Sequence, residues 1–191
     1  MFTTAPATPD RWDHVAAVMG TRGDPARCWC QYFKLRGRTW ETTPREAKRE
    51  ALRAQVDHDP APPGVLAYAD AEPVGWCAVA PKPAYPRLLA SRLAGPGDEP
   101  GIETVWSVTC FVVVVGRRRR GVATALLDAA VDLARDHGAS AVEGYPVDHA
   151  ARASVSSAAL YRGTVTLFAA AGFAEVGRPA ADRAVMRKPL N

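Results

Sequence analysis

Long apolar runs are absent from this chain of 191 residues. No segment approaches the ~18 consecutive apolar residues that cross a membrane, and the start, Met1-Phe2-Thr3-Thr4, lacks the basic and apolar regions of a signal peptide. With 48% apolar and 23% charged residues, the composition excludes disordered, collagenous and coiled-coil proteins. We therefore expect one globular domain over residues 1–191, without a membrane partner and in the cytoplasm.

Cysteine is also scarce, with four residues in the chain. Cys77 and Cys110 lie inside apolar runs, and a chain of this length does not need disulfides, so we expect reduced thiols. The segment Cys28-Trp29-Cys30 supplies two of the four ligands that a tetrahedral zinc site needs. No second Cys or His pair accompanies it, and we expect no metal.

Lysine is rare, and 20 of the 24 basic residues are arginine, in a chain of net charge +4. Arginine suits phosphate and carboxylate groups better than lysine does. The run from Arg117 to Arg120 would fit a nucleic-acid patch. However, it follows a valine-rich segment and precedes a helical pattern, with no RNA-binding or helix-turn-helix pattern around it. Nucleic acid is therefore not an expected partner.

The hydrophobic pattern predicts a mixed order of helices and strands. Helices are expected after Thr8-Pro9-Asp10, from the capping box Thr43-Pro44-Arg45-Glu46 to about Asp57, from Val122 to His137-Gly138, and over 164–171. Strands are expected over 65–69, 74–80, 104–115, 141–145, 174–177 and 184–188. The first two strands form a hairpin, and the third is a central strand buried on both faces. Segments 20–38 and 81–101 are expected to be loops with short helical turns.

The junction of the central strand with the next helix has the features of an anion site. The first amides of a helix have no partner inside the helix and point at a bound phosphate, which the helix dipole also favours. Gly121 and Ala123 are small enough for a close approach to the backbone. The segment matches neither the Walker loop nor the dinucleotide-binding Gly-x-Gly-x-x-Gly motif.

The pattern Arg118-x-x-Gly121-x-Ala123 after a valine-rich strand resembles the pyrophosphate-binding motif of the GNAT superfamily of N-acetyltransferases. Two further features occur in the usual order, Val74-Gly75 in the hairpin and Ala171-Gly172-Phe173 after a short helix. The resemblance covers residues 62–190 well and the first 60 in outline. It implies an α/β (α+β) fold in which helices flank a mixed, splayed central sheet that binds acetyl-CoA.

The resemblance also implies roles for individual residues. The main chain around Phe111, Val112 and Val113 would bind the pantetheine arm and the acetyl carbonyl. The pyrophosphate would lie against seven residues of the junction, Arg118, Arg119, Arg120, Gly121, Val122, Ala123 and Thr124. An amine of a small molecule or peptide would attack the thioester directly in a ternary complex. A non-catalytic acyl-CoA-binding module is the alternative function. The protein could also form a homodimer.

Two positions depart from the family pattern. Many members carry a tyrosine four residues before the glycine of Ala-Gly-Phe, whose hydroxyl protonates the departing thiolate, and here this residue is Phe168. Tyr161 and Tyr145 are the nearest substitutes, although either could simply pack its ring and solvate its hydroxyl.

The second departure concerns the base. Some members place a glutamate on the central strand, and Ser107 stands there. Glu103 would share a face with Ser107 on a regular strand and could act through water. Glu143 is the other candidate, or it forms a salt bridge with an arginine.

The acceptor is expected to bind over the segment from Cys28 to Phe33 and over the loop 81–101. Four aromatic residues could line a slot there or belong to the core, Trp29, Tyr32, Trp76 and Tyr85. Asp148 and His149 are either acceptor contacts or solvated loop residues.

Overall fold

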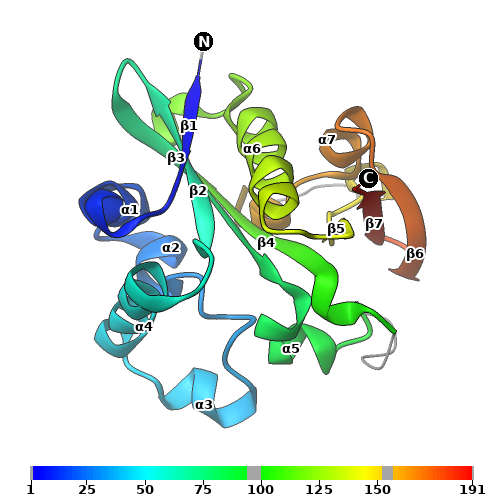
Figure 1. Ribbon diagram of the computed structural model, residues 1–191, viewed down its shortest axis with the longest axis horizontal. Helices are drawn as coiled ribbons and strands as arrows, with labels where there is room; N and C mark the ends of the chain where they lie inside the picture. Colours follow the sequence, from blue (N-terminus) through cyan, green and yellow to red (C-terminus); the bar gives the residue numbers. More distant parts are fainter. Residues whose placement is uncertain (1, 94–99, 152–156, 191) are drawn as a thin grey trace.

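A computed structural model describes residues 2–93, 100–151 and 157–190 (Figure 1). Part of the expected loop 81–101, residues 94–99, and residues 152–156 lie outside the described residues. The seven strands are β1 (Thr3–Pro6), β2 (Gly64–Ala69), β3 (Glu72–Pro81), β4 (Val105–Val113), β5 (Ala141–Gly144), β6 (Ala174–Ala180) and β7 (Arg183–Pro189). They form one mixed sheet in the order β1-β2-β3-β4-β5-β7-β6. All neighbours are antiparallel except β4 and β5, which are parallel.

Helices cover both faces of this sheet. Before β4 lie α1 (Trp12–Met19), α2 (Gly23–Cys28), α3 (Gly37–Thr42), α4 (Arg45–His58) and α5 (Pro86–Leu89), and after it lie α6 (Val122–Asp136) and α7 (Val165–Ala170). Short 3₁₀ helices are η1 (Pro9–Arg11), η2 (Lys82–Ala84), η3 (Ile102–Thr104), η4 (Val115–Arg117), η5 (His149–Ala151) and η6 (Ser157–Arg162). None of the helices in the described ranges is long and apolar enough to cross a membrane.

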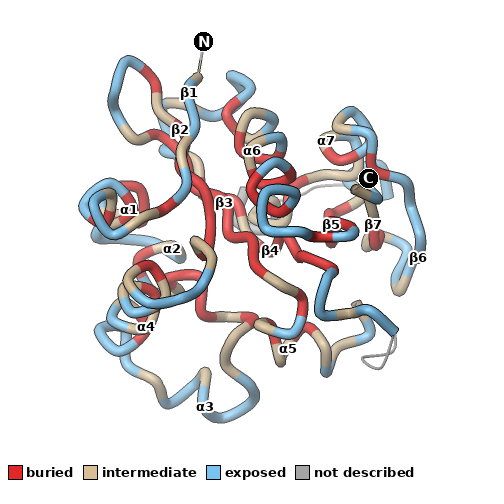
Figure 2. Tube along the Cα trace, in the orientation of Figure 1, coloured by how far each residue is buried: buried red, intermediate tan, exposed pale blue. Residues whose placement is uncertain are grey.

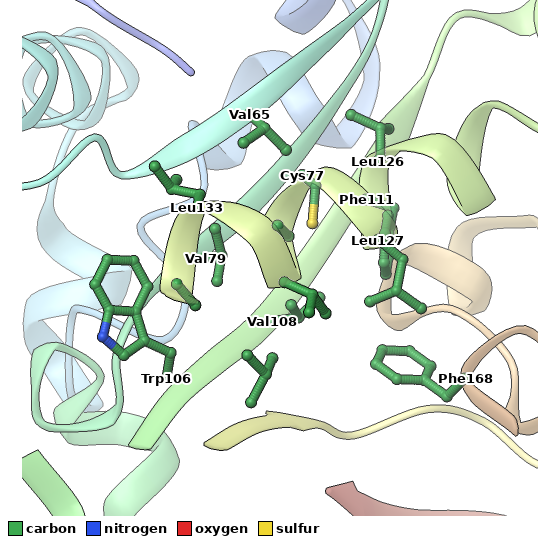
Figure 3. Close-up of a cluster of buried hydrophobic side chains, with 14 of the residues drawn as sticks. Val65, Cys77, Val79, Trp106, Val108, Phe111, Leu126, Leu127, Leu133 and Phe168 are labelled. Carbon is green, nitrogen blue, oxygen red and sulfur yellow. The ribbon is translucent and has the colours of Figure 1, made fainter. Parts of the chain in front are cut away.

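Helix α6 packs its apolar stripe on one face of the sheet. Leu126, Leu127 and Leu133 lie against strand residues such as Val79 and Val108 (Figure 3). On the opposite face, α1 and α4 bury a second cluster around Trp12, Leu52 and Trp76. The central strands are therefore buried on both faces, whereas the outer surfaces of α4 and α6 are exposed (Figure 2). The expected mixed, flanked sheet is confirmed.

A β-bulge in β4 exchanges the faces to which its side chains point. Ala78 pairs with Cys110 while Val79 pairs with Val108, so Thr109 is an extra residue without an opposite partner on β3. Before the bulge, Val108 packs on the α6 side. After it, Cys110 packs on the opposite side, with the α1 cluster. The bulge therefore places Cys110 on the face that carries Ser107.

The structure corrects two local expectations near the N-terminus and agrees with a third. Strand β1 was not predicted by the sequence pattern, and it adds an antiparallel edge to β2. The capping box at Thr43 does not form, because its hydroxyl donates to the Thr39 carbonyl and Pro44 takes the N-cap position. Segment 20–38 holds α2 and the start of α3, which agrees with the short helical turns expected there.

Candidate active site

The separation of β4 from β5 defines the site. The parallel ladder between them ends at the pair Val108 and Gly144, whereas β4 stays paired with β3 as far as Val113. Among the described strands, none pairs with the β5 side of β4 beyond the bulge. A strand edge of this kind offers N–H and C=O groups to an extended ligand. The segment Phe111–Val113, expected to bind the pantetheine arm, lies on this edge.

The chain then turns from β4 into α6 through two left-handed residues. Arg119 and Gly121 have φ angles of +58° and +87°. A Cβ atom at Gly121 would meet no atom within 4 Å, so the backbone there is open to a close approach. The amides of the first turn of α6 lack helical partners, and the Gly121 carbonyl already accepts the amide of Ala125. This arrangement is suited to a phosphate group.

The arginines of the junction lie around this open backbone. Arg118, Arg119 and Arg120 are exposed. The Nε atom of Arg118 donates to the carbonyl of Val113 at 3.4 Å, which joins the end of β4 to the junction. The junction thus combines oriented amides with three solvent-facing guanidinium groups, and these residues fit a diphosphate.

A buried polar network lies at the point where the strands separate. The hydroxyls of Ser107 and Tyr145 are 3.0 Å apart, and Tyr145 donates to Glu143 Oε2 at 2.8 Å. Lys82 Nζ is 2.8 Å from the same oxygen, while Arg187 Nε donates to Oε1 at 2.8 Å. A tyrosine hydroxyl has one proton, so Ser107 is the donor in its bond with Tyr145. The hydrogen bonds therefore run from Ser107 through Tyr145 to Glu143.

Burial and then the Glu143 charge raise the pKa of Tyr145 well above its usual value. Tyr145 therefore keeps its proton and remains a donor. Ser107 and Glu143 are buried as well. From the sequence, Glu143 was either a candidate base or the partner of an arginine in a salt bridge. In the structure, its carboxylate pairs with both Lys82 and Arg187. With its two oxygens occupied by these cations and Tyr145, Glu143 orients the network.

The expectation that Glu103 shares a strand face with Ser107 is wrong. Strand β4 begins at Val105, and Glu103 lies in the 3₁₀ turn before it, with its side chain exposed. The turn breaks the alternation of side chains on which this pairing depended. Lys82, by contrast, was missed: it is one of four lysines and follows the apolar strand β3 directly, which was a usable signal.

Tyr161 is half-buried in η6, on the same side as Tyr145. Both residues contact one cluster, together with Phe33 and Tyr85. The hydroxyl of Tyr161 accepts a hydrogen bond from Arg162 Nε at 2.8 Å. Burial raises the pKa of Tyr161, and this outweighs the opposite effect of Arg162. Tyr161 is therefore a protonated hydroxyl near neutral pH.

Phe168, at the usual position of the tyrosine, belongs to the core (Figure 3). Its ring packs edge-on against Phe111 and Phe173, with ring centroids 6.2 and 5.0 Å away.

The segment Cys28–Phe33 contributes mainly to the core. Cys30 is buried and accepts a hydrogen bond from Trp76 Nε1 at 3.2 Å. Burial and the neighbouring Cys30 raise the pKa of Cys28 to about 12, so its thiolate is disfavoured. The four cysteines are free, and the described residues contain no group of three or more potential metal ligands. Trp29, Trp76 and Tyr85 are buried in hydrophobic clusters, as expected of core residues.

Beside Tyr161 the surface forms an open hollow of ≈ 440 Å³. Tyr32 and Phe33 lie on its wall, together with Arg36, Arg87 and Arg162. This hollow brings the two expected acceptor segments together, since Arg87 belongs to α5 in the loop 81–101. Sequence reasoning named Tyr32 but missed the three arginines.

The other two acceptor candidates lie in and beside η5. Asp148 forms an ion pair with Arg178 at 2.9 Å, and His149 is exposed. The ion pair ties the start of this segment to β6.

The splayed mixed sheet, with helices on both faces and an anion-suited junction after β4, defines an α/β protein of mixed sheet topology. Consistent with this, the family model for the acetyltransferase (GNAT) family matches residues 28–162. The chain belongs to the GNAT acetyltransferase family.

Solved structures agree with this fold. A GNAT-family acetyltransferase from Streptococcus pneumoniae superposes with a TM-score of 0.58 at 16% identity, covering 100% of both chains. A GCN5-related N-acetyltransferase from Kribbella flavida gives 0.54 at 21% identity, covering 99% of this chain and 98% of the other. A protein from Salmonella typhimurium, solved with its cofactor acetyl-CoA, gives 0.56 at 12% identity over 100% and 94%. The search of curated proteins gave no match.

Proposed function

We propose that this protein transfers an acetyl group from acetyl-CoA to a primary amine of a small molecule or peptide. The observation that carries the proposal is the unpaired edge of β4 leading directly into the open junction at Gly121. Pantetheine amides would bind the strand edge, and the pyrophosphate would bind the first turn of α6 and the arginines before it. The amine would then attack the thioester directly, with both substrates held in one complex.

The coenzyme site is tested by placing a carboxylate at the junction. We expect Gly121→Asp to weaken acetyl-CoA and CoA binding by tenfold or more, because it adds negative charge and bulk where the pyrophosphate would lie. Isothermal titration calorimetry on both proteins measures this. The left-handed backbone at Gly121 also strains any other residue, so the variant needs a control for that strain.

Gly138 provides the matched control. It follows the opposite end of α6 and has a φ of +74°, and a Cβ there would also meet no atom within 4 Å. Gly138→Asp should therefore cause similar backbone strain but leave coenzyme affinity close to that of the wild type. Equal affinity loss in both variants, or no loss in Gly121→Asp, would refute the junction as the pyrophosphate site.

Within this function, we assign the proton donor for the leaving thiolate to Tyr161 and a positioning role to Ser107. Tyr161 replaces the tyrosine that position 168 lacks, and its raised pKa keeps the proton available. Ser107 is buried and donates to Tyr145, so it acts by fixing Tyr145 and the cluster that Tyr161 contacts.

For Tyr161→Phe we expect kcat to fall about tenfold with little change in the KM for acetyl-CoA, since general acids contribute at least this much. The decisive readout compares acetyl-CoA with an acetyl thioester of a more acidic thiol. A more acidic thiol leaves as a stable thiolate without a proton donor. With this acetyl donor, Tyr161→Phe should therefore lower kcat less than with acetyl-CoA. The same fall for both donors would indicate that Tyr161 only packs against the cluster.

A non-catalytic acyl-CoA-binding module is the second candidate, favoured by the core position of Phe168 and by the serine at position 107. It predicts coenzyme binding that is lost in Gly121→Asp, but no acetylated product from any amine.

A further inference from the structure

We infer that the hollow beside Tyr161 binds an acid group of the acceptor, so the substrate is a small amine that also carries a carboxylate, phosphonate or phosphate. This inference rests on the proposed acetyl transfer and specifies its acceptor. The hollow, here called the arginine hollow, is lined by three arginines, two aromatic residues and four small or apolar residues: Arg36, Arg87, Arg162, Tyr32, Phe33, Gly37, Ala90, Ser91 and Leu93.

Among the described residues that line the arginine hollow, none is acidic, so none of them balances the charge of the three arginines. Several arginines elsewhere on the surface form ion pairs, as Arg27 does with Asp24 and Arg178 does with Glu175. Within the described ranges, no carboxylate lies within ion-pair distance of the three arginines of the hollow. Three guanidinium groups around one hollow repel one another, and an anion between them removes that repulsion.

Two of the three guanidinium groups are held in place by their Nε atoms. Arg87 Nε donates to the Leu35 carbonyl at 2.7 Å, and its guanidinium lies over the ring of Tyr32 at 4.5 Å. Arg162 Nε donates to the Tyr161 hydroxyl, and its guanidinium lies over the ring of Phe33 at 5.0 Å. Their terminal nitrogens form no hydrogen bond or ion pair with the described residues and can bind a ligand. A guanidinium fixed in this way loses little freedom when it binds an oxyanion in bidentate fashion.

The position and size of the hollow connect it with the transfer site. Arg162 bonds to the hydroxyl that we assign as proton donor. Phe33, on the wall of the hollow, packs in the same cluster as Tyr145, the partner of Ser107. A volume of ≈ 440 Å³ is in the range of pockets for small molecules. An acid group bound here would hold the amine of a small acceptor on the face of the sheet that carries the network.

The test uses pairs of amines that share a skeleton and differ in one acid group. Phenylalanine is compared with phenethylamine, and 2-aminoethylphosphonate with ethylamine, so the two pairs separate carboxylate from phosphonate recognition. We expect kcat/KM for the acid-bearing member of at least one pair to exceed that of the plain amine by about tenfold or more, because charge-assisted hydrogen bonds are strong. Equal use of both members, or preference for the plain amines, would overturn the inference but leave the acetyltransferase function intact.

Variants then assign the preference to the arginine hollow. Arg87→Met and Arg36→Met should each raise KM for the acid-bearing amine severalfold to tenfold and leave the plain amine unchanged. Arg36 is exposed, so its variant keeps the test valid if the loss of the Arg87 contact to Leu35 disturbs folding. Arg92 is exposed next to Ser91 and does not line the hollow, and Arg92→Met is the matched control with unchanged kinetics. An equal effect in Arg92→Met and Arg36→Met would contradict a specific site.

A binding measurement separates failure of this inference from failure of the proposed function. If no amine is acetylated, calorimetry with phenylalanine and 2-aminoethylphosphonate in the presence of CoA still tests the hollow. Binding of either compound that is weakened about tenfold in Arg36→Met would support the acid-group site without catalysis. Absence of binding for both would overturn it.

Discussion

Replacing Glu143 with glutamine is expected to lower the free energy of unfolding by about 3 kcal/mol, in the range measured when one partner of a buried ion pair is removed. Glutamine keeps the shape of the side chain and can still accept the hydrogen bond of Tyr145. It removes the charge that faces Lys82 at 2.8 Å and Arg187 at 2.6 Å. Lys82 is buried and cannot recover this loss from water. Urea denaturation would measure this change in the free energy of unfolding. In thermal denaturation, the same change should lower Tm by about 10 °C for a chain of this size.

The control for Glu143→Gln is the same substitution in an exposed ion pair. Glu50 lies 2.7 Å from Arg49, and its side chain is 64% exposed. Because water already solvates this carboxylate, Glu50→Gln should change stability by less than about 0.5 kcal/mol. Similar losses in the two variants would show that burial does not strengthen the Glu143 pairs.

A double-mutant cycle with Lys82→Met assigns the loss to the buried pair. Removing both charges eliminates the uncompensated cation, so the double variant should be more stable than the sum of the single losses predicts, by at least about 1 kcal/mol. Strict additivity would mean that Lys82 and Glu143 do not stabilise each other. In that case Arg187 and Tyr145 would hold the carboxylate.

The cycle also bears on the site, because Glu143 accepts a hydrogen bond from Tyr145, and Tyr145 accepts one from Ser107. The sequence showed Glu143 as a charged residue inside an apolar strand, but its partners come from η2 and β7. Which distant cation reaches a buried carboxylate depends on the order of strands in the sheet. The local sequence pattern therefore identified Glu143 as a charge in an apolar strand, but only the tertiary structure identified Lys82 as its partner.

The junction shows the opposite case, where local sequence was sufficient to predict structure. A run of β-branched residues, then Gly121, then an apolar stripe at helical spacing predicts a strand, a turn and a helix without any long-range information. Strand β4 and helix α6 appear where expected. The roles proposed for the residues of this junction stay predictions until coenzyme binding is measured.

The bulge at Thr109 could not be predicted in the same way. Cys110 to Val115 is continuously apolar, so either face could be assigned to each residue, and the alternation gives no sign of an extra residue. The bulge becomes visible only in the register with β3. The arginine hollow could not be predicted from local sequence either, because Arg36, Arg87 and Arg162 come from three separate segments that only the fold brings together.

The second large effect is expected at Gly144, where no methyl group can be accommodated. A Cβ atom there would lie 2.0 Å from Cε1 of Phe168. The ring cannot move aside easily, because it is buried between Phe111 and Phe173. Gly144→Ala should therefore destabilise the protein by about 3 kcal/mol, at the upper end of overpacking, as measured by urea denaturation. Gly116→Ala is the control, since a Cβ there would meet no atom within 4 Å.

A second substitution tests whether Phe168 causes this loss. Leucine at position 168 is shorter, so Gly144→Ala combined with Phe168→Leu should be more stable than the two single losses predict. If Gly144→Ala alone were neutral, the ring would not occupy the space over β5. The expected result would show that position 168 fills the core against β5 where the strands separate. Phe168 has no hydroxyl and fills the core, so it cannot protonate the thiolate, and Tyr161 stays the donor that we propose.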